Sequence, residues 1–243
     1  QTLLDRAWQI IRLVRRWLPG RAVVFVADSS FAALELLDRV AQLSRVSVIT
    51  RLRLDAALYD PPPPRAPGQR GRPRLKGKRR PTLEAVLADE KTQWSTLTVD
   101  DWYGEGPREV EVTTDTAVWY HAGKPPVAIR WVLIRDPQER FKPQALLSTN
   151  VEYACAQMLT WFVRRWTMEV TFEEARAHLG METQRQWHDR AIARATPALL
   201  SLYSVITLTA HLLIEKGETW VRSTAWDGKT RPMFSDAIAW VRR

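Results

Sequence analysis

The segment at residues 162–176, FVRRWTMEVTFEEAR, places one carboxylate between two guanidinium groups. Arg165, Glu169 and Arg176 are separated by four and seven residues, and a helix with 3.6 residues per turn brings such positions onto one face. Cations on both sides hold the acid ionised, and arginines beyond its reach can bind phosphate oxygens. The alternative is an ordinary surface helix with ion pairs worth about 0.2–0.5 kcal/mol each. The spacing alone leaves both interpretations open.

A second acid, Asp28, follows an apolar run of strand length, AVVFVA at residues 22–27. Before this run, residues 2–18 repeat apolar side chains at helical spacing, which predicts an amphipathic helix ended by Pro19 and Gly20. After it, we expect a helix at 31–43 and a second strand at 46–50. This order is typical of a parallel β-α-β unit, in which ligands bind beyond the carboxyl ends of the strands. Asp28 is therefore a candidate site residue.

Residues 61–83 begin with four consecutive prolines and continue with cations and no acid. No core can form from this composition, so we expect an extended basic loop. Such a loop is either a linker or a surface for phosphates, and the density of positive charge favours phosphates. Its eight cations are Arg65, Arg70, Arg72, Arg74, Lys76, Lys78, Arg79 and Arg80.

The composition of the 243 residues, 45% hydrophobic and 26% charged, is that of a folded chain with one large or two small domains. A net charge of +9 favours a polyanionic partner, with nucleic acid ahead of a membrane surface. The single cysteine, Cys155, and the lack of a signal-peptide pattern at the start favour the cytoplasm. Because the chain begins with Gln1 rather than Met and a helix is expected from residue 2 onward, we take it to be a fragment or a processed piece. The four histidines lack metal-ligand spacing, so we predict no zinc site.

Residues 94–149 alternate β-prone segments with Gly, Pro and Asp clusters, which predicts an antiparallel sheet inserted into the α/β unit. Helices are expected at 153–166, 168–179 and 192–214. Residues 195–214 carry no Lys, Arg, Asp or Glu, but Pro197 and several hydroxyl groups favour a core helix over a membrane span. Leu199, Leu202, Ile206 and Leu213 suit burial in such a core.

Four passages of the chain resemble the DDE-type transposases of bacterial insertion sequences. They are VVFVADSSF, RLRLDAALYDPPPP with GRPRLKGKR, DWYG, and RRWTMEVTFEEARAHLGMETQRQW, and the resemblance spans residues 16–213. One branch of this family carries its glutamate in a motif of Tyr, Arg, Glu and Lys, which matches Phe162, Arg165, Glu169 and Arg176 here. Arg176 keeps the positive charge of the lysine. Phe162 lacks the tyrosine hydroxyl that the family places near phosphate.

The resemblance implies an α/β fold with an RNase H-like core, incomplete at its N-terminus, and an inserted β-rich region. In such a core two aspartates and a glutamate bind two divalent metals, usually Mg²⁺, with Mn²⁺ as a substitute. Asp28 is similar to the second aspartate and Glu169 to the glutamate, so both are expected catalytic residues and metal ligands, with carboxylates within about 8 Å of each other. Trp102 and Trp119 lie where related transposases stack a tryptophan on a flipped base, although a core tryptophan is the alternative.

The resemblance further implies metal-dependent DNA cleavage and strand transfer at transposon ends. The expected partner is double-stranded DNA, both transposon end and target, with no membrane and with a homodimer in the DNA complex as an open expectation. Expected DNA contacts are Phe162, Arg165, Arg176, Trp102, Arg70, Arg72, Arg74, Lys76, Lys78, Arg79 and Arg80. Expected domains are 1–52 (start of the core), 53–93 (basic loop), 94–150 (inserted β-rich region), 151–215 (C-terminal helices) and 216–243 (tail).

Two alternatives remain open beside an active transposase. The family's first aspartate would lie upstream of this chain, since Asp5 inside the opening helix is a poor substitute. The isolated chain is then expected to be inactive, or the protein is a catalytically inactive DNA-binding transposase remnant. A glycoside hydrolase with Asp28 and Glu169 as its carboxylate pair is the other alternative. The positive charge argues against it, because a neutral sugar does not need arginines.

Overall fold

The computed structural model describes residues 1–65, 68, 71–183, 185, 187–218, 220–221 and 232–242. The chain divides into two compact units, Gln1–Arg165 and Trp166–Arg243, which we call unit 1 and unit 2. Unit 1 is a mixed α/β unit with a seven-stranded sheet. The division falls inside residues 151–215, which the sequence pattern treats as one set of helices.

Most elements of unit 1 lie where the sequence predicts them, among them the opening helix and the first two strands. The helix expected from residue 31 begins at Leu34 instead, because Asp28 caps a short 3₁₀ turn before it. In chain order the elements are α1 (Leu3–Trp17), β1 (Val23–Val26), η1 (Ser29–Phe31), α2 (Leu34–Ala41), β2 (Val46–Leu52), β3 (Leu58–Tyr59), α3 (Leu83–Ala88), β4 (Ser95–Val99), β5 (Arg108–Trp119), β6 (Val127–Arg135), β7 (Gln144–Ser148) and α4 (Cys155–Arg164).

The sheet has the strand order β1-β2-β7-β6-β5-β3, with β4 also paired to β5. β1 and β2 are parallel, which confirms the expected β-α-β unit. β7 pairs antiparallel with β2, with Ile49 opposite Ser148, and β6 and β5 follow as an antiparallel meander. The β-rich segment therefore continues the sheet that β1 and β2 begin.

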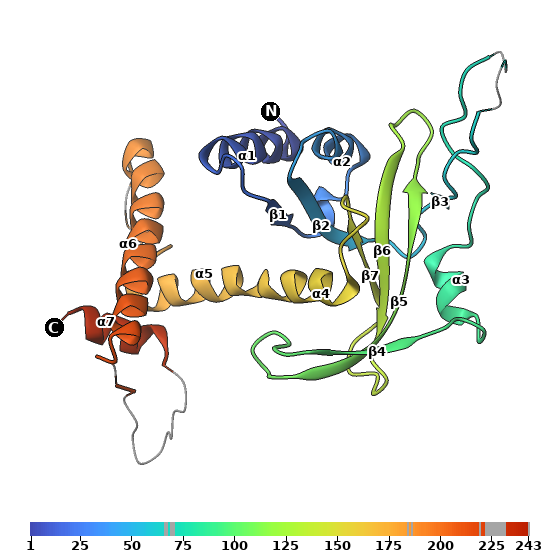
Figure 1. Cartoon of the computed structure of the whole chain (residues 1–243). Helices are drawn as coiled ribbons and strands as arrows, with labels where there is room; N and C mark the ends of the chain where they lie inside the picture. Colours follow the sequence, from blue (N-terminus) through green and yellow to red (C-terminus); the bar gives the residue numbers. More distant parts are fainter. Residues whose placement is uncertain are drawn as a thin grey trace. The chain divides into compact units, whose positions relative to one another are not determined.

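Helices cover both faces of this sheet (Figure 1). α1 and α2 pack on one face, where Leu37 of α2 and Leu147 of β7 are fully buried in the same cluster. α4 packs on the other face, where Leu159 meets Leu146 of β7 in a second cluster. The side chains of consecutive β7 residues thus point to opposite faces of the sheet, as the period of two in a strand requires.

Unit 2 contains α5 (Trp166–Leu179), α6 (Asp189–Glu215) and α7 (Phe234–Val241). Its core joins α6 to α7, and the ring of Tyr203 stacks on that of Phe234 with centroids 4.3 Å apart. Trp240 is buried and donates its indole N–H to the carbonyl of Trp220. The tail expected at 216–243 therefore contributes a packed helix, which the sequence pattern did not predict.

The apolar helix α6 is less buried than its sequence predicts. Ile206 is buried, whereas Leu199 and Leu213 are half-buried and Leu202 is 46% exposed, so the expected core role is wrong for Leu202. By length and composition alone, α6 is the one helix in the described part of the chain that could cross a membrane. Pro197 lies within its first three turns.

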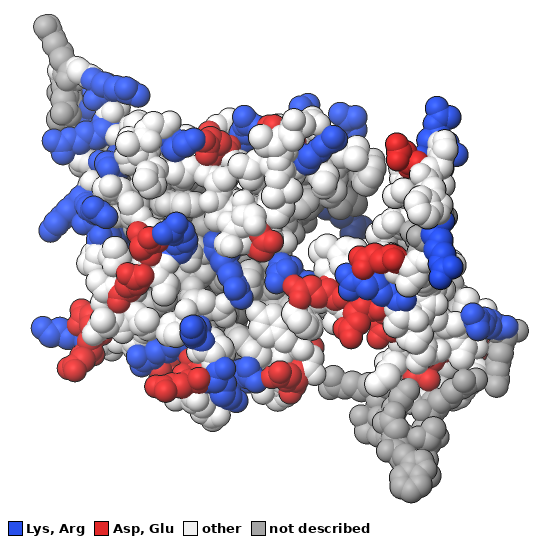
Figure 2. All heavy atoms as spheres, turned by 180° about the vertical axis from the view of Figure 1, so that it is seen from behind, with Lys and Arg blue, Asp and Glu red and all other residues white. Residues whose placement is uncertain are grey.

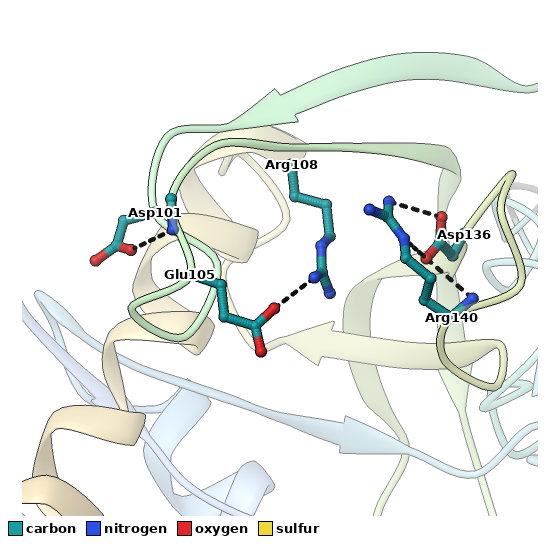
Figure 3. A network of polar contacts seen from close by, with 6 residues as sticks. Asp101, Glu105, Arg108, Asp136 and Arg140 are labelled. Atoms are coloured by element: carbon teal, nitrogen blue, oxygen red, sulfur yellow. Dashed lines mark hydrogen bonds and ion pairs between the residues drawn. The ribbon is translucent and has the colours of Figure 1, made fainter.

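A buried carboxylate orders the turn between β6 and β7 (Figure 3). Asp136 accepts hydrogen bonds from the backbone N–H groups of Gln138 and Arg140 and from the Arg140 guanidinium, with Nε at 2.7 Å. The hydrogen bond from Arg140 outweighs the effect of burial and lowers the pKa of Asp136 to about 2.

Acid should therefore weaken unit 1 through Asp136. Because the folded pKa lies below the ordinary value of 3.8, the stabilisation is complete above about pH 5 and is lost as the pH falls through 3.8 toward 2. We expect Asp136→Asn to lower the free energy of unfolding at pH 7 by about 1–2 kcal/mol, after allowance for the partly exposed arginine. Urea unfolding of both proteins between pH 7 and pH 2.5 measures this. A difference that stays constant down to pH 2.5 would contradict the assignment.

Candidate functional site

Asp28 lies just after the carboxyl end of β1 and is exposed, beside the part of β2 that continues past its pairing with β1. Its carboxylate Oδ1 accepts a hydrogen bond of 2.8 Å from the backbone N–H of Ser30. The Thr50 hydroxyl on β2 donates to the Asp28 carbonyl, and the N–H of Ala27 donates to the carbonyl of Ile49. Two strands therefore fix the backbone that carries this carboxylate.

Arg51 follows Thr50 on β2 and is a candidate site residue that the sequence pattern did not single out. It is exposed, and its guanidinium carbon lies 5.7 Å from the centroid of the Phe162 ring. Strand pairing places Arg51 at the same sheet edge as Asp28. The arginine is visible in the sequence as part of RLR at residues 51–53, but only the pairing of β2 with β1 shows that it lies near Asp28.

Phe162 does not lie at a phosphate-binding surface. It is 2% exposed and packs in the α4 cluster with Met158 and Leu159. Arg51 and Arg165 lie near its ring, at 5.7 and 5.9 Å from the centroid. The sheet covers the Phe162 ring, so its expected DNA contact stays a prediction that this packing does not support.

The arginines around Glu169 do not share one helix. α4 ends at Arg164, Arg165 is its C-cap, and α5 begins at Trp166. Arg165 thus belongs to unit 1 and Glu169 to unit 2, so the pairing of Glu169 with Arg165 or with Asp28 stays a prediction. Arg176 lies seven residues after Glu169 on α5, and both are exposed. Its guanidinium forms an ion pair with Glu182 at 2.6 Å.

No cluster of metal ligands is formed by the described residues: among them, no three His, Cys, Asp or Glu side chains lie together. Asp28 is an exposed hard oxygen donor of the kind that Mg²⁺ prefers. The single carboxylate fits one ligand position of a divalent ion.

Trp102 is a core residue. It is 4% exposed, its ring stacks on Phe141 with centroids 5.0 Å apart, and the Arg108 guanidinium lies 5.5 Å from the ring centroid. Arg108 in turn pairs with Glu105, beside the Asp136 turn (Figure 3). The ring is covered, so its expected stacking on a flipped base stays a prediction that this packing does not support. Trp119 is half-buried and lines a groove with Tyr59 and Tyr120.

The basic loop has a fixed base, and we call residues 61–80 the basic arm. Arg80 bridges Asp60 and Asp115 at 2.7 and 2.8 Å. The Lys76 ammonium lies over the rings of Tyr59 and Tyr120, at 3.5 and 4.3 Å from their centroids. These two cations therefore anchor the arm to β3 and β5.

A close backbone approach also holds the base of the arm. A Cβ on Gly77 would lie 2.6 Å from the carbonyl oxygen of Pro61, so the two sides of the arm approach where only glycine fits. The amide of Gly77 donates to the carbonyl of Asp60.

The other cations of the arm remain available at its surface. Arg72, Arg74, Lys78 and Arg79 are exposed, and Figure 2 shows the blue side chains of the arm gathered at the upper left. Arg65 donates to the carbonyl of Gly71. Arg70 lies outside the described residues. The arm is therefore an anchored basic surface, which favours phosphate binding over a mere linker.

The family model of the DDE superfamily endonucleases matches residues 1–126. This match covers slightly more than half of the 243 residues and includes Asp28 and the basic arm, whereas Glu169 lies outside it. No curated protein matches the chain. The matched region contains the β1-β2 edge described above, and the chain belongs to the DDE superfamily endonucleases.

Proposed function

We propose that this chain is part of an insertion-sequence transposase that acts on double-stranded DNA. The observation that carries the proposal is the exposed carboxylate of Asp28 at the carboxyl end of β1, inside the region that matches the family. The basic arm and a net charge of +9 support a polyanionic substrate. An RNase H-like core, with Asp28 as its second aspartate and Glu169 as its glutamate, belongs to this proposal.

Asp28 and Glu169 would hold divalent metal, with Mg²⁺ as the expected ion. When bound, a metal pair activates a nucleophile and stabilises the leaving oxygen of a phosphodiester. The arginines of the chain would bind the phosphates of the DNA substrate. Arg51 stands at the same sheet edge as Asp28 and can neutralise a phosphate there, and the arm can hold the DNA backbone.

A catalytically inactive DNA-binding remnant is the second candidate. It is favoured by the family match, which ends at residue 126 and does not reach Glu169. A DDE site that lacks one of its three carboxylates binds its metal ions less tightly. The transition-state stabilisation lost with the metal is worth several kcal/mol, or several powers of ten in rate.

The two candidates differ in metal binding. For the transposase, we expect Asp28→Asn and Glu169→Gln each to weaken Mn²⁺ binding roughly tenfold or more, as measured by electron paramagnetic resonance of the free ion. Glu173→Gln, an exposed acid on the same helix, is the matched control and should bind Mn²⁺ as the wild type does. Equal Mn²⁺ binding by all four proteins would favour the remnant.

DNA binding and cleavage are measured together on labelled duplex with Mg²⁺ or Mn²⁺. We expect the purified chain to retard the duplex without nicking it. Metal-dependent nicking that Asp28→Asn abolishes would show an active enzyme and contradict the remnant. Failure to retard DNA even at 50 mM salt would contradict both candidates.

A further inference from the structure

Five arginines line one groove of unit 1, at the end of the sheet where β1 and β2 begin. The groove has a volume of about 740 Å³ and lies between the last turns of α1, the loop before β1 and the loop before β2. Its cations are Arg12, Arg15, Arg16, Arg21 and Arg45, and Trp8 forms part of its wall. None of the described residues that line it is an acid.

The backbone builds this groove from two loops. Arg45 has a left-handed backbone with φ of 62°, which is uncommon for a residue other than glycine. Its guanidinium donates to the carbonyl of Gly20 at 2.5 Å, and its own carbonyl accepts from the N–H of Val23 at 2.8 Å. Arg15 donates to the hydroxyl of Ser44 at 3.4 Å. Arg15 and Arg45 are therefore held by hydrogen bonds to the residues that line the groove.

The other three, Arg12, Arg16 and Arg21, are exposed and form no side-chain hydrogen bond to any residue that the structure describes. Cations in the last turn of a helix offset the negative end of its dipole, which explains Arg15 and Arg16. This effect does not reach Arg12, one turn earlier, or Arg21 in the loop. A cluster of like charges without acids is unfavourable unless an anion neutralises it.

We propose that this arginine groove binds the phosphate backbone of duplex DNA at a site apart from Asp28. The proposal rests on the proposed function for its choice of DNA as the polyanion. β1 separates the two places, since Arg21 precedes this strand and Asp28 follows it. Seven residues of extended chain span roughly 20 Å. The groove therefore holds phosphates several base pairs from those at the carboxylate, or those of a second duplex.

The test compares two double variants by fluorescence anisotropy on a labelled 30-base-pair duplex. Arg12→Gln with Arg16→Gln removes two groove cations and should weaken binding about 60-fold at 0.1 M salt, with a salt slope lower by about 1.8. Arg6→Gln with Arg39→Gln removes the same charge from exposed positions of α1 and α2 outside the groove and should bind nearly as the wild type does. Arg21→Gln, in the loop, should weaken binding about eightfold and gives a second measurement independent of α1.

The outcomes separate this inference from the proposed function. If the wild type binds the duplex and both double variants bind equally well, the groove is not a DNA site and the proposed function stands. If the wild type does not bind duplex DNA, the proposed function fails. Tighter binding of double-stranded RNA than of DNA, lost in the groove variant, would overturn the choice of DNA.

Discussion

Replacing four exposed cations of the basic arm by glutamine is expected to weaken the binding of duplex DNA by about 4,000-fold at 0.1 M salt. The four are Arg72, Arg74, Lys78 and Arg79, and all four side chains are exposed. Each phosphate contact contributes about 0.9 to the slope of log K against log salt, so the slope should fall by about 3.6. Anisotropy titrations of one duplex at several salt concentrations measure both quantities.

The matched control removes the same charge elsewhere. Lys91, Lys142, Arg185 and Lys216 are exposed and lie outside the arm, so their quadruple glutamine variant should keep most of the salt slope. Because Arg80 and Lys76 anchor the base of the arm and are left intact, the arm variant should retain the fold. Equal losses in both quadruple variants would show that net charge, and not the arm, determines binding.

Replacing Trp102 by alanine should lower the free energy of unfolding of unit 1 by about 3–5 kcal/mol. The indole is 4% exposed and stacks on Phe141, and its removal leaves a cavity while stripping Arg108 of its aromatic contact. Urea unfolding followed by circular dichroism measures the change. Trp17→Ala is the control, since Trp17 is 66% exposed in the same unit, and should change the stability by about 0.5 kcal/mol or less.

DNA affinity distinguishes the core role of Trp102 from base stacking. A buried ring makes no contact with DNA, so the folded fraction of Trp102→Ala should bind duplex DNA as the wild type does. If stability were unchanged and affinity fell by about 1–3 kcal/mol, the tryptophan would be stacking on a base. That result would mean that the ring leaves the core when DNA binds.

Local patterns were sufficient for most of the secondary structure. The apolar spacing of α1 and the apolar run of β1 predicted their elements almost to the residue, because burial of one helical face or of a whole strand imposes its period on the sequence. The start of α2 was less accurate, since the carboxylate of Asp28 forms a competing 3₁₀ cap. α7 was not predicted, because its packing partner Tyr203 lies about thirty residues earlier on α6.

The sequence by itself indicated the class of chemistry: carboxylates, many arginines and a net charge of +9 point to phosphates. Only the tertiary structure decided which of these residues work together. Strand pairing placed Arg51 near Asp28. The end of α1 and two loops, joined by the hydrogen bond from Arg45 to Gly20, brought five arginines into one groove. Packing also buried Phe162 and Trp102, two of the expected DNA contacts. The physical reason is that a sequence motif determines only which side chains are close along the chain. Whether a side chain is exposed, and which distant side chains lie beside it, depends on contacts between residues far apart in sequence.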